Sequence, residues 1–255
     1  MAPAAGRPAP LSAVGVELVA PTTFVREDNA MCGRFTLSTP AQTLQQVFDL
    51  RETPDLPPRY NIAPSEAIAT VRLPEPQTGR RLDLLRWGLV PPWAKEPDVG
   101  ARMINARAET AATLPAFRAA FRRRRCLIPA DGFYEWQQVA HRGKQPFYLR
   151  LRDGQPFAVA GLWEHWTGPH GEALDTCTIL TTAPNELLRP IHNRMPVILD
   201  PQEWALWLDP AVQDPARLQP LLRPYLADQM IAFPVSQMVN HPANDHAACI
   251  VPRAA

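Results

Sequence analysis

The alternation of apolar and polar positions predicts a chain built mostly from short strands. Residues 32–38 have the pattern of a strand, and two apolar stretches at 67–73 and 82–90 flank a turn-prone segment, which predicts a hairpin. Further strands are expected at 133–139, 147–152, 157–163, 176–182, 196–199 and 230–235. The strands do not alternate regularly with helices, so a doubly wound parallel sheet is disfavoured.

Helices are predicted where a capping residue precedes an apolar face with helical spacing. Thr39 is expected to cap the first helix, and Gln42 is the reciprocal partner of a capping box. The proline-rich residues 51–64, which follow this helix, are expected to form an ordered loop. Three further helices are expected at 109–125 and from the starts Asp200-Pro201 and Asp214-Pro215.

This balance of elements predicts an α+β fold with a mostly antiparallel, barrel-like sheet core and a few flanking helices. We expect residues 32–255 to form a single domain, because no internal linker divides them. Residues 1–31 are rich in proline and alanine at their start and lack a secretory signal, so we expect a disordered leader or a mis-assigned start that is absent from the mature protein. The chain has no apolar run of ~18 residues, so we expect no transmembrane helix.

The charge of the chain is balanced, but its basic residues are almost all arginine. The net charge is +1, and 26 basic residues minus the two lysines, Lys95 and Lys144, leaves 24 arginines. This excess fits phosphate contacts and also fits a coding bias. The run Arg122–Arg125 ends a predicted helix and is interpreted as a solvated helix end. The four cysteines form no C-x-x-C pair, which favours a reducing compartment.

Four polar clusters stand where a plain sheet protein would not need them: MCGRF (31–35), MINARAET (103–110), PADGFYEW (129–136) and IHNRMP (191–196). Four more segments occur with them: RYNIAP (59–64), RWGLVPPWAK (86–95), KQPFYL (144–149) and PVSQMVN (234–240). Together and in this order, they resemble the SOS response-associated peptidase (SRAP) family, whose members process abasic sites and form covalent crosslinks to DNA. The resemblance covers residues 32–255.

Cys32 is the candidate nucleophile. As the first residue of a chain it would carry an α-amine, which titrates near ~8 against ~10.4 for a lysine and is therefore more often the free base at neutral pH. The amine can form an imine with the aldehyde of a ring-opened abasic sugar, and the thiol can then close a thiazolidine. The residues before Cys32 must first be absent, either because translation starts at Met31 and that methionine is removed, or because the leader is cleaved by the peptidase activity attributed to the family. Without the resemblance, a buried structural cysteine is the more common role.

The resemblance implies three further catalytic residues. Asn105 would position the abasic sugar, Glu135 would transfer protons during imine formation, and His192 would promote ring opening and reversal of the crosslink. Glu135 lies between two aromatic residues, and desolvation there would raise its pKa. On their own, Glu135 also fits a solvent-facing strand position and His192 a structural role.

The resemblance also implies a set of DNA-binding residues: Arg34, Asn61, Pro64, Trp93, Arg107 and Arg194. The arginines can form ion pairs with DNA phosphates, and Trp93 can stack on a base. If the INAR stretch is extended, Glu109 falls on the same face as Arg107, and it is expected to pair with an arginine or to cap the next helix. Met195 stands where related sequences often carry another basic residue. Trp87 and Trp163 are expected in the core.

The function implied is an abasic-site sensor that crosslinks to single-stranded DNA or to single-strand/double-strand junctions, with slow, lyase-like reversal and a peptidase activity on its own N-terminus. We expect a cytoplasmic monomer, nucleoid-associated when bound to DNA, with no membrane contact and no obligate protein partner. No cofactor is implied, and the spacing of His241, His246 and Cys249 matches no common zinc pattern. Two alternatives stay open: an amidohydrolase with an N-terminal nucleophile, and a non-covalent single-strand binding module.

Overall fold

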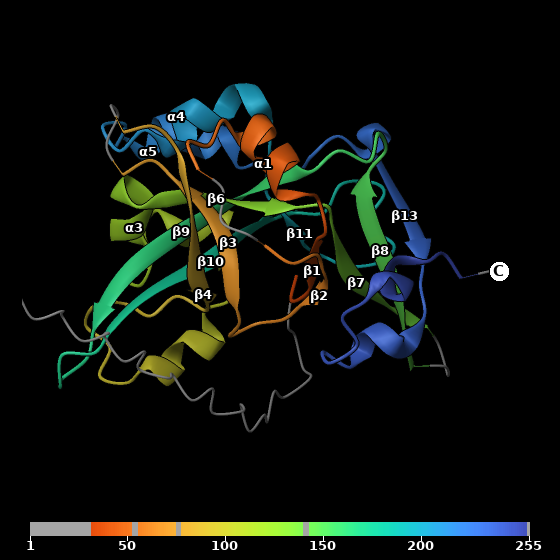
Figure 1. Ribbon diagram of the computed structural model, residues 1–255. Coiled ribbons are helices and arrows are strands. Elements are labelled where there is room, and N and C mark those ends of the chain that lie inside the picture. The colour runs from red at the N-terminus through yellow and green to blue at the C-terminus, as the bar shows by residue number, and fades with distance from the viewer. Residues whose placement is uncertain (1–31, 53–55, 75–77, 140–142, 254–255) are drawn as a thin grey trace, which may run out of the picture. The chain divides into compact units, whose positions relative to one another are not determined.

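A computed structural model describes residues 32–52, 56–74, 78–139 and 143–253 (Figure 1). The predicted leader 1–31 lies outside the described residues. The strands are β1 Phe35–Leu37, β2 Arg59–Ile62, β3 Ala67–Arg72, β4 Arg81–Trp87, β5 Asn105–Arg107, β6 Arg125–Ala130, β7 Gly132–Val139, β8 Gly143–Leu151, β9 Phe157–Thr167, β10 Ala173–Thr182, β11 Met195–Pro196, β12 Ile198–Leu199 and β13 Met230–Pro234. The α-helices are α1 Ala41–Phe48, α2 Ala108–Ala111, α3 Arg118–Arg123, α4 Trp204–Leu208 and α5 Pro215–Leu218.

Five strands, β10, β4, β3, β6 and β9, close into a barrel, because β10 pairs with β4 on one side and with β9 on the other. The predicted hairpin is present as β3 and β4, paired antiparallel from Ala67↔Arg86 to Arg72↔Arg81. Most neighbours are antiparallel, while β4 and β5 each run parallel to β10. The predicted α+β fold with a mostly antiparallel, barrel-like core is therefore confirmed.

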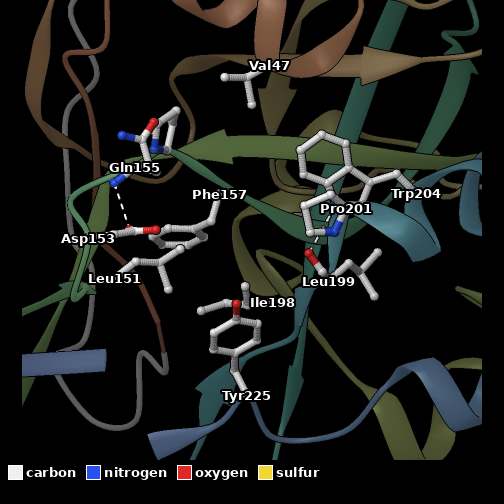
Figure 2. Close-up of a pocket in the computed structure, with 11 residues that line it drawn as sticks. Val47, Leu151, Asp153, Gln155, Phe157, Ile198, Leu199, Pro201, Trp204 and Tyr225 are labelled. Carbon is white, nitrogen blue, oxygen red and sulfur yellow. Dashed lines mark hydrogen bonds between the residues drawn. The ribbon is translucent and has the colours of Figure 1, made fainter. Parts of the chain in front are cut away.

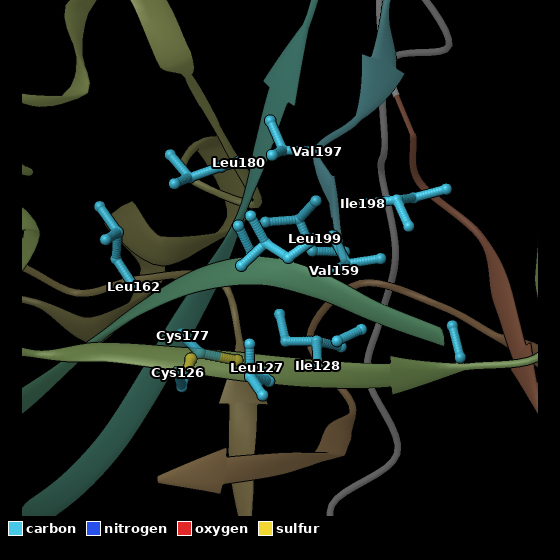
Figure 3. Packing of buried hydrophobic residues seen from close by; sticks show 14 of the residues in the cluster. Cys126, Leu127, Ile128, Val159, Leu162, Cys177, Leu180, Val197, Ile198 and Leu199 are labelled. Atoms are coloured by element: carbon cyan, nitrogen blue, oxygen red, sulfur yellow. The ribbon is translucent and has the colours of Figure 1, made fainter. Parts of the chain in front are cut away.

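The main core fills the barrel and the space beneath the helices. Apolar residues of β6, β9 and β10 belong to one buried cluster there, part of which Figure 3 shows. Gly161 on β9 lies opposite Cys126 on β6, and a Cβ built at Gly161 would come within 2.8 Å of the Cys126 sulfur. The close approach of β6 and β9 therefore depends on a residue without a side chain.

A second sheet has the strand order β13-β8-β7-β1-β2 and is antiparallel throughout. Strands β7 and β8 cover the strands predicted at 133–139 and 147–152 and form a hairpin, whose tip at 140–142 lies outside the described residues. One face of this sheet packs a smaller core with the C-terminal segment: Tyr134, Tyr148, Val235, Val239 and Cys249. This sheet carries two of the candidate catalytic residues to the site.

Three element predictions are wrong. The predicted loop 51–64 contains strand β2, and strand β6 was not predicted. The predicted helix 109–125 is divided into α2 and α3, because Pro115 lacks the N–H that a continuous helix needs. Trp87 lies in the core and Trp163 packs against it, as predicted.

The expected cap at Thr39 is also wrong. Helix α1 starts at Ala41 without a side-chain cap. The Thr39 backbone N–H and hydroxyl and the Ser38 hydroxyl all donate to the carboxylate of Asp131, so this threonine ties α1 to the turn between β6 and β7. The start at Asp214 is as predicted, since its side chain accepts a hydrogen bond from the Ala216 N–H.

None of the helices in the described ranges has the length and apolar character that crossing a bilayer requires.

Candidate active site

Cys32 lies just before β1, where the backbone turns into the sheet. Its φ of +41° is in the left-handed region, and the side chain is buried at 3% exposure. The Tyr134 N–H donates to the Arg34 carbonyl, so the β1–β7 ladder continues up to this point. The ladder fixes the Cys32 backbone nitrogen next to β7, where it donates to Glu135 Oε1 at 3.0 Å.

Glu135 is buried at 1% exposure at the middle of β7. Burial raises the pKa of Glu135 to about 8, although hydrogen bonds from Cys32 work in the opposite direction. Successive side chains of a strand point to opposite faces, so the aromatic neighbours Tyr134 and Trp136 lie on the other face from Glu135. The raised pKa follows the predicted direction, but the burial comes from the groups that face Glu135 and not from its sequence neighbours.

His192 approaches the same carboxylate from the loop before β11. Its Nδ1 lies 3.6 Å from Glu135 Oε2, and the Arg194 N–H donates to Nδ1 at 3.2 Å. Burial lowers the pKa of His192 below its ordinary value, and the positive charges of Lys144 and Arg194 lower it further. The imidazole is therefore neutral at pH 7 and can accept a proton.

The Cys32 thiol is electrostatically disfavoured as a thiolate. Burial raises its pKa well above the usual value, and the nearby Glu135 raises it further, while the positive charge of Arg194 works against both. The two ionisable neighbours, Glu135 and Arg194, thus shift the pKa of the same thiol in opposite directions. The thiol is protonated at neutral pH in this environment.

Arg194 is held by protein groups and does not project freely into solvent. Its guanidinium forms a bidentate ion pair with Glu109, with N–O distances of 2.7 and 2.9 Å, and it also donates to the Thr181 carbonyl. The expectation that Glu109 pairs with an arginine is confirmed. A DNA phosphate that binds Arg194, as predicted, would have to share its guanidinium with Glu109 or displace Glu109 from it.

Asn105 and Arg107 lie on β5, which runs beside β10. Asn105 is half-buried, and Arg107 is exposed and pairs in register with Thr181. Thr181 is also the residue whose carbonyl holds Arg194. The end of β5 therefore lies next to the arginine that acts on Cys32, with Asn105 two residues before that end.

Arg34 and Asn61 form one hydrogen-bonded unit with the C-terminal segment. Arg34 donates to Asn61 Oδ1 at 2.9 Å and to the Val239 carbonyl at 2.8 Å. The Asn61 amide is fully buried and donates to the carbonyls of Val239, His241 and Asn244. The Asn61 side chain is therefore enclosed and holds Arg34 in position, while its role in DNA binding stays a prediction.

The C-terminal segment was missed as part of the site. Asp245 accepts hydrogen bonds from the backbone N–H groups of Tyr60 and Asn61, and its carboxylate also pairs with Arg59. The segment PVSQMVN was noted in the sequence, but no spacing rule connects residue 245 to residues 59–61. Hydrogen bonds across some 184 positions are a product of the fold.

Pro64 and Trp93 lie on the surface, as a DNA-contacting role requires. Pro64 is half-buried, and the Trp93 side chain is 63% exposed. A large apolar side chain so open to solvent is available for stacking.

A cavity of about 290 Å³ lies elsewhere, between α1, the β8–β9 turn, β12 and α4 (Figure 2). It is lined by residues such as Phe157, Trp204 and Tyr225, and by none of the candidate catalytic or DNA-binding residues. Within the described residues, no group of three or more His, Cys, Asp or Glu side chains is arranged to hold a metal ion. The candidate catalytic residues that the structure brings together are Cys32, Glu135 and His192.

Comparisons with known proteins agree with one another. A family model described as SOS response associated peptidase (SRAP) matches residues 31–242. The chain is 47% identical over 218 residues to the abasic site processing protein YoqW of Bacillus subtilis (strain 168), covering 84% of this chain and 96% of that protein. It is 30% identical over 229 residues to the abasic site processing protein YedK of Escherichia coli (strain K12), covering 87% and 100%. A crystal structure of a Bacteroides thetaiotaomicron protein shares the fold, with a TM-score of 0.78 at 24% identity over 88% of this chain and 100% of that one.

Proposed function

The chain belongs to the SOS response-associated peptidase family, and we propose that it processes abasic sites in DNA by forming a covalent thiazolidine crosslink through Cys32. The observation that carries this proposal is the hydrogen bond of the Cys32 backbone nitrogen to a buried carboxylate that also faces a histidine. Once Cys32 is the first residue, that nitrogen is an α-amine, and a proton acceptor already lies 3.0 Å away.

The pKa of Glu135 suits the first step. An α-amine titrates near ~8, and burial raises the pKa of Glu135 to about 8, so a proton passes between them at little cost in free energy. The amine then adds to the aldehyde carbon of the ring-opened sugar. Protonated Glu135 gives its proton to the resulting hydroxyl, which leaves as water, and an imine remains.

The protonated state of the thiol supports the order of the steps. Because the pKa of the Cys32 thiol is well above its usual value, the amine reacts before the sulfur does. The sulfur then adds to the imine carbon, and the thiol proton ends on the nitrogen. Overall, one aldehyde and one aminothiol give a thiazolidine and one water. His192 supports sugar ring opening and the reverse reaction, because its lowered pKa keeps the imidazole in the neutral, proton-accepting form.

The reaction requires that the residues before Cys32 be absent from the active protein, because an acylated nitrogen cannot form an imine. We propose that translation starts at Met31 and the methionine is removed, or that the leader is cleaved by the protein itself. The Cys32 nitrogen already contacts Glu135 while it is still the nitrogen of a peptide bond. Removal of the preceding residues therefore changes the nitrogen without requiring the site to rearrange.

The DNA partner that we propose is single-stranded DNA, or a single-strand/double-strand junction, with the abasic sugar at Cys32 and Asn105. Arg107 and Trp93 are exposed and can meet a phosphate and a base. Arg34 and Arg194 bind protein groups as well, so they contribute charge from fixed positions. We propose that the protein acts as a monomer in the cytoplasm, where it meets the nucleoid.

The test is a crosslinking assay on protein shown by mass spectrometry to begin at Cys32. Incubation with a single-stranded oligonucleotide that carries one abasic site is expected to give a band that survives denaturation, with the summed mass minus one water. The same oligonucleotide without the lesion is expected to give none. Protein that keeps residues 1–31 should form no adduct.

A Cys32→Ala variant that also starts at position 32 separates the alternatives. It keeps the α-amine and should form only a labile imine, which borohydride traps. A non-covalent binding module would give no covalent species from either protein, and an amidohydrolase would ignore the oligonucleotide. Absence of any adduct from trimmed wild-type protein refutes the proposal.

A further inference from the structure

Helix α3 presents a cluster of arginines away from the Cys32 site. Arg118, Arg122 and Arg123 are exposed on this helix, and together with Arg124 they line a hollow of about 410 Å³. The helix packs against β6 and β9 of the barrel (Figure 1), whereas Cys32 and Glu135 belong to the other sheet. We call these four residues the α3 arginine cluster.

The positive charge of the cluster is only partly balanced by the protein. Arg124 pairs with Glu164 at 2.6 Å, and Arg123 donates to the neutral side chain of Gln213. No hydrogen bond or ion pair joins the Arg118 or Arg122 side chain to any other residue in the described part of the chain. These two lie four positions apart on one helix, where like charges repel.

The base of the cluster is rigid. Arg125 is buried at 3% exposure, and its guanidinium donates to backbone carbonyls that include Phe121, Arg122 and Val212. The aromatic residues of this region, Phe117 and Phe121, are buried in the core. The helix surface therefore offers guanidinium groups on a fixed support, and Phe117 and Phe121 offer no ring on which a base could stack.

We propose that the α3 arginine cluster binds the sugar-phosphate backbone of DNA at a second place, outside the abasic pocket. This inference rests on the proposed function, which supplies DNA as the anionic partner. Guanidinium forks match phosphate oxygens, and contacts to phosphate alone carry no base sequence. The cluster therefore adds affinity for any DNA that extends far enough from the lesion.

Strand β10 gives the scale of that extension. Glu164, which holds Arg124, pairs with Thr176 on β10, and Arg194 binds Thr181 five residues further along the same strand. At ~3.3 Å per residue, these points are about 17 Å apart along β10. A duplex advances ~3.4 Å per base pair, so DNA must continue for at least about five base pairs past the lesion to reach α3.

The test compares two double variants of the full chain by binding to undamaged 7-mer and 30-mer oligonucleotides, single-stranded and with a duplex arm. Arg118→Gln/Arg122→Gln removes two charges from the cluster, and Arg51→Gln/Arg253→Gln removes two exposed charges elsewhere. Both change the net charge from +1 to −1, because +1 − 2 = −1. Equal melting temperatures establish that both fold.

The cluster variant is expected to bind the 30-mers roughly tenfold more weakly at 0.1 M salt, with the salt dependence of log K smaller by roughly 1.4 to 1.8. The control variant is expected to behave as wild type, and the 7-mers are expected to lose less affinity than the 30-mers, because a 7-mer bound at one of the two places does not reach the other. Equal losses in both variants, or no loss in either, overturn the inference. A third result also overturns the inference: inorganic phosphate competes with DNA for the cluster, and the length of the DNA has no effect on binding. The cluster would then be a site for small anions.

Crosslinking of a short abasic oligonucleotide by the trimmed cluster variant is expected to match that of wild type. This measurement separates the two proposals, since it depends on the Cys32 site and not on the α3 arginine cluster. Loss of the 30-mer effect with normal crosslinking contradicts only the second DNA contact. Absence of crosslinking in every protein contradicts the proposed function instead.

Discussion

Replacing Glu135 by glutamine is expected to stabilise the folded protein, and to do so more strongly as the pH rises. The pKa of Glu135 is about 8 in the fold against an ordinary value of 4.5. Between these values the unfolded chain has released this proton while the folded chain still holds it. Stability is therefore lost as the pH rises from 4.5 to 8, by ~1.36 kcal/mol per pH unit.

The size of the effect follows from the same two values. The shift of 8 − 4.5 = 3.5 units corresponds to a total of about 5 kcal/mol, reached above pH 8. Between pH 5 and pH 8 the change is about 3 to 4 kcal/mol. Glutamine keeps an oxygen that can accept from the Cys32 N–H and carries no charge to desolvate, so it avoids this cost.

The assay is urea unfolding of wild type and Glu135→Gln at pH 5 and pH 8, compared as a double difference so that other titrating groups cancel. Glu96→Gln is the matched control, because Glu96 is exposed. The free energy of unfolding of Glu135→Gln relative to wild type should rise by about 3 to 4 kcal/mol between the two pH values. A difference that does not depend on pH would refute the raised pKa and, with it, the match to the α-amine.

Three further measurements, one on Glu135→Gln and two on other substitutions, test the site and its support. In the crosslinking assay, a Glu135→Gln variant that begins at Cys32 should react ~100- to 10,000-fold more slowly than wild type, because the glutamine side chain cannot transfer a proton. An unchanged rate would mean that Glu135 takes no part in the mechanism. Arg125→Gln should lower the free energy of unfolding by at least ~3 kcal/mol, because the buried carbonyls that accept from Arg125 lose their donors. Thermal melting measures this loss, and a loss under ~1 kcal/mol would contradict the prediction. Gly161→Ala should cost ~1–3 kcal/mol by urea unfolding, because its Cβ would press on Cys126, and a neutral result would mean that β6 and β9 move apart freely.

The sequence was sufficient to predict most strands, because short apolar stretches on either side of a turn-prone segment indicate paired strands. The hairpin β3–β4 is of this kind, and β3 is buried at every position except the first. It failed where an individual side chain had a partner far along the chain. Thr39 has the residue type of a helix cap, but Asp131 offers its hydroxyl and N–H a better acceptor.

The arginine run shows the same limit for charged residues. Arg122 and Arg123 are exposed at the end of α3, as a solvated helix end requires. Arg125 starts strand β6 and is buried, because carbonyls from three separate segments converge on its guanidinium. No local sequence pattern distinguishes Arg125 from the arginines before it. The prediction of a solvated helix end therefore applies to Arg122 and Arg123 and is wrong for Arg125.

The candidate catalytic residues were named by resemblance, but their arrangement is a property of the closed fold. The Cys32 nitrogen and Glu135 are 103 positions apart, and Arg34 is held by carbonyls some 205 positions away. Each of these contacts forms only when β1 has entered the second sheet between β2 and β7 and the C-terminal segment has packed on Asn61. A carboxyl group with a pKa of about 8 exists only under those conditions, because the shift comes from burial. The proton transfer that we propose to speed the reaction of Cys32 therefore belongs to the folded domain, and a peptide that starts with the same residues lacks it.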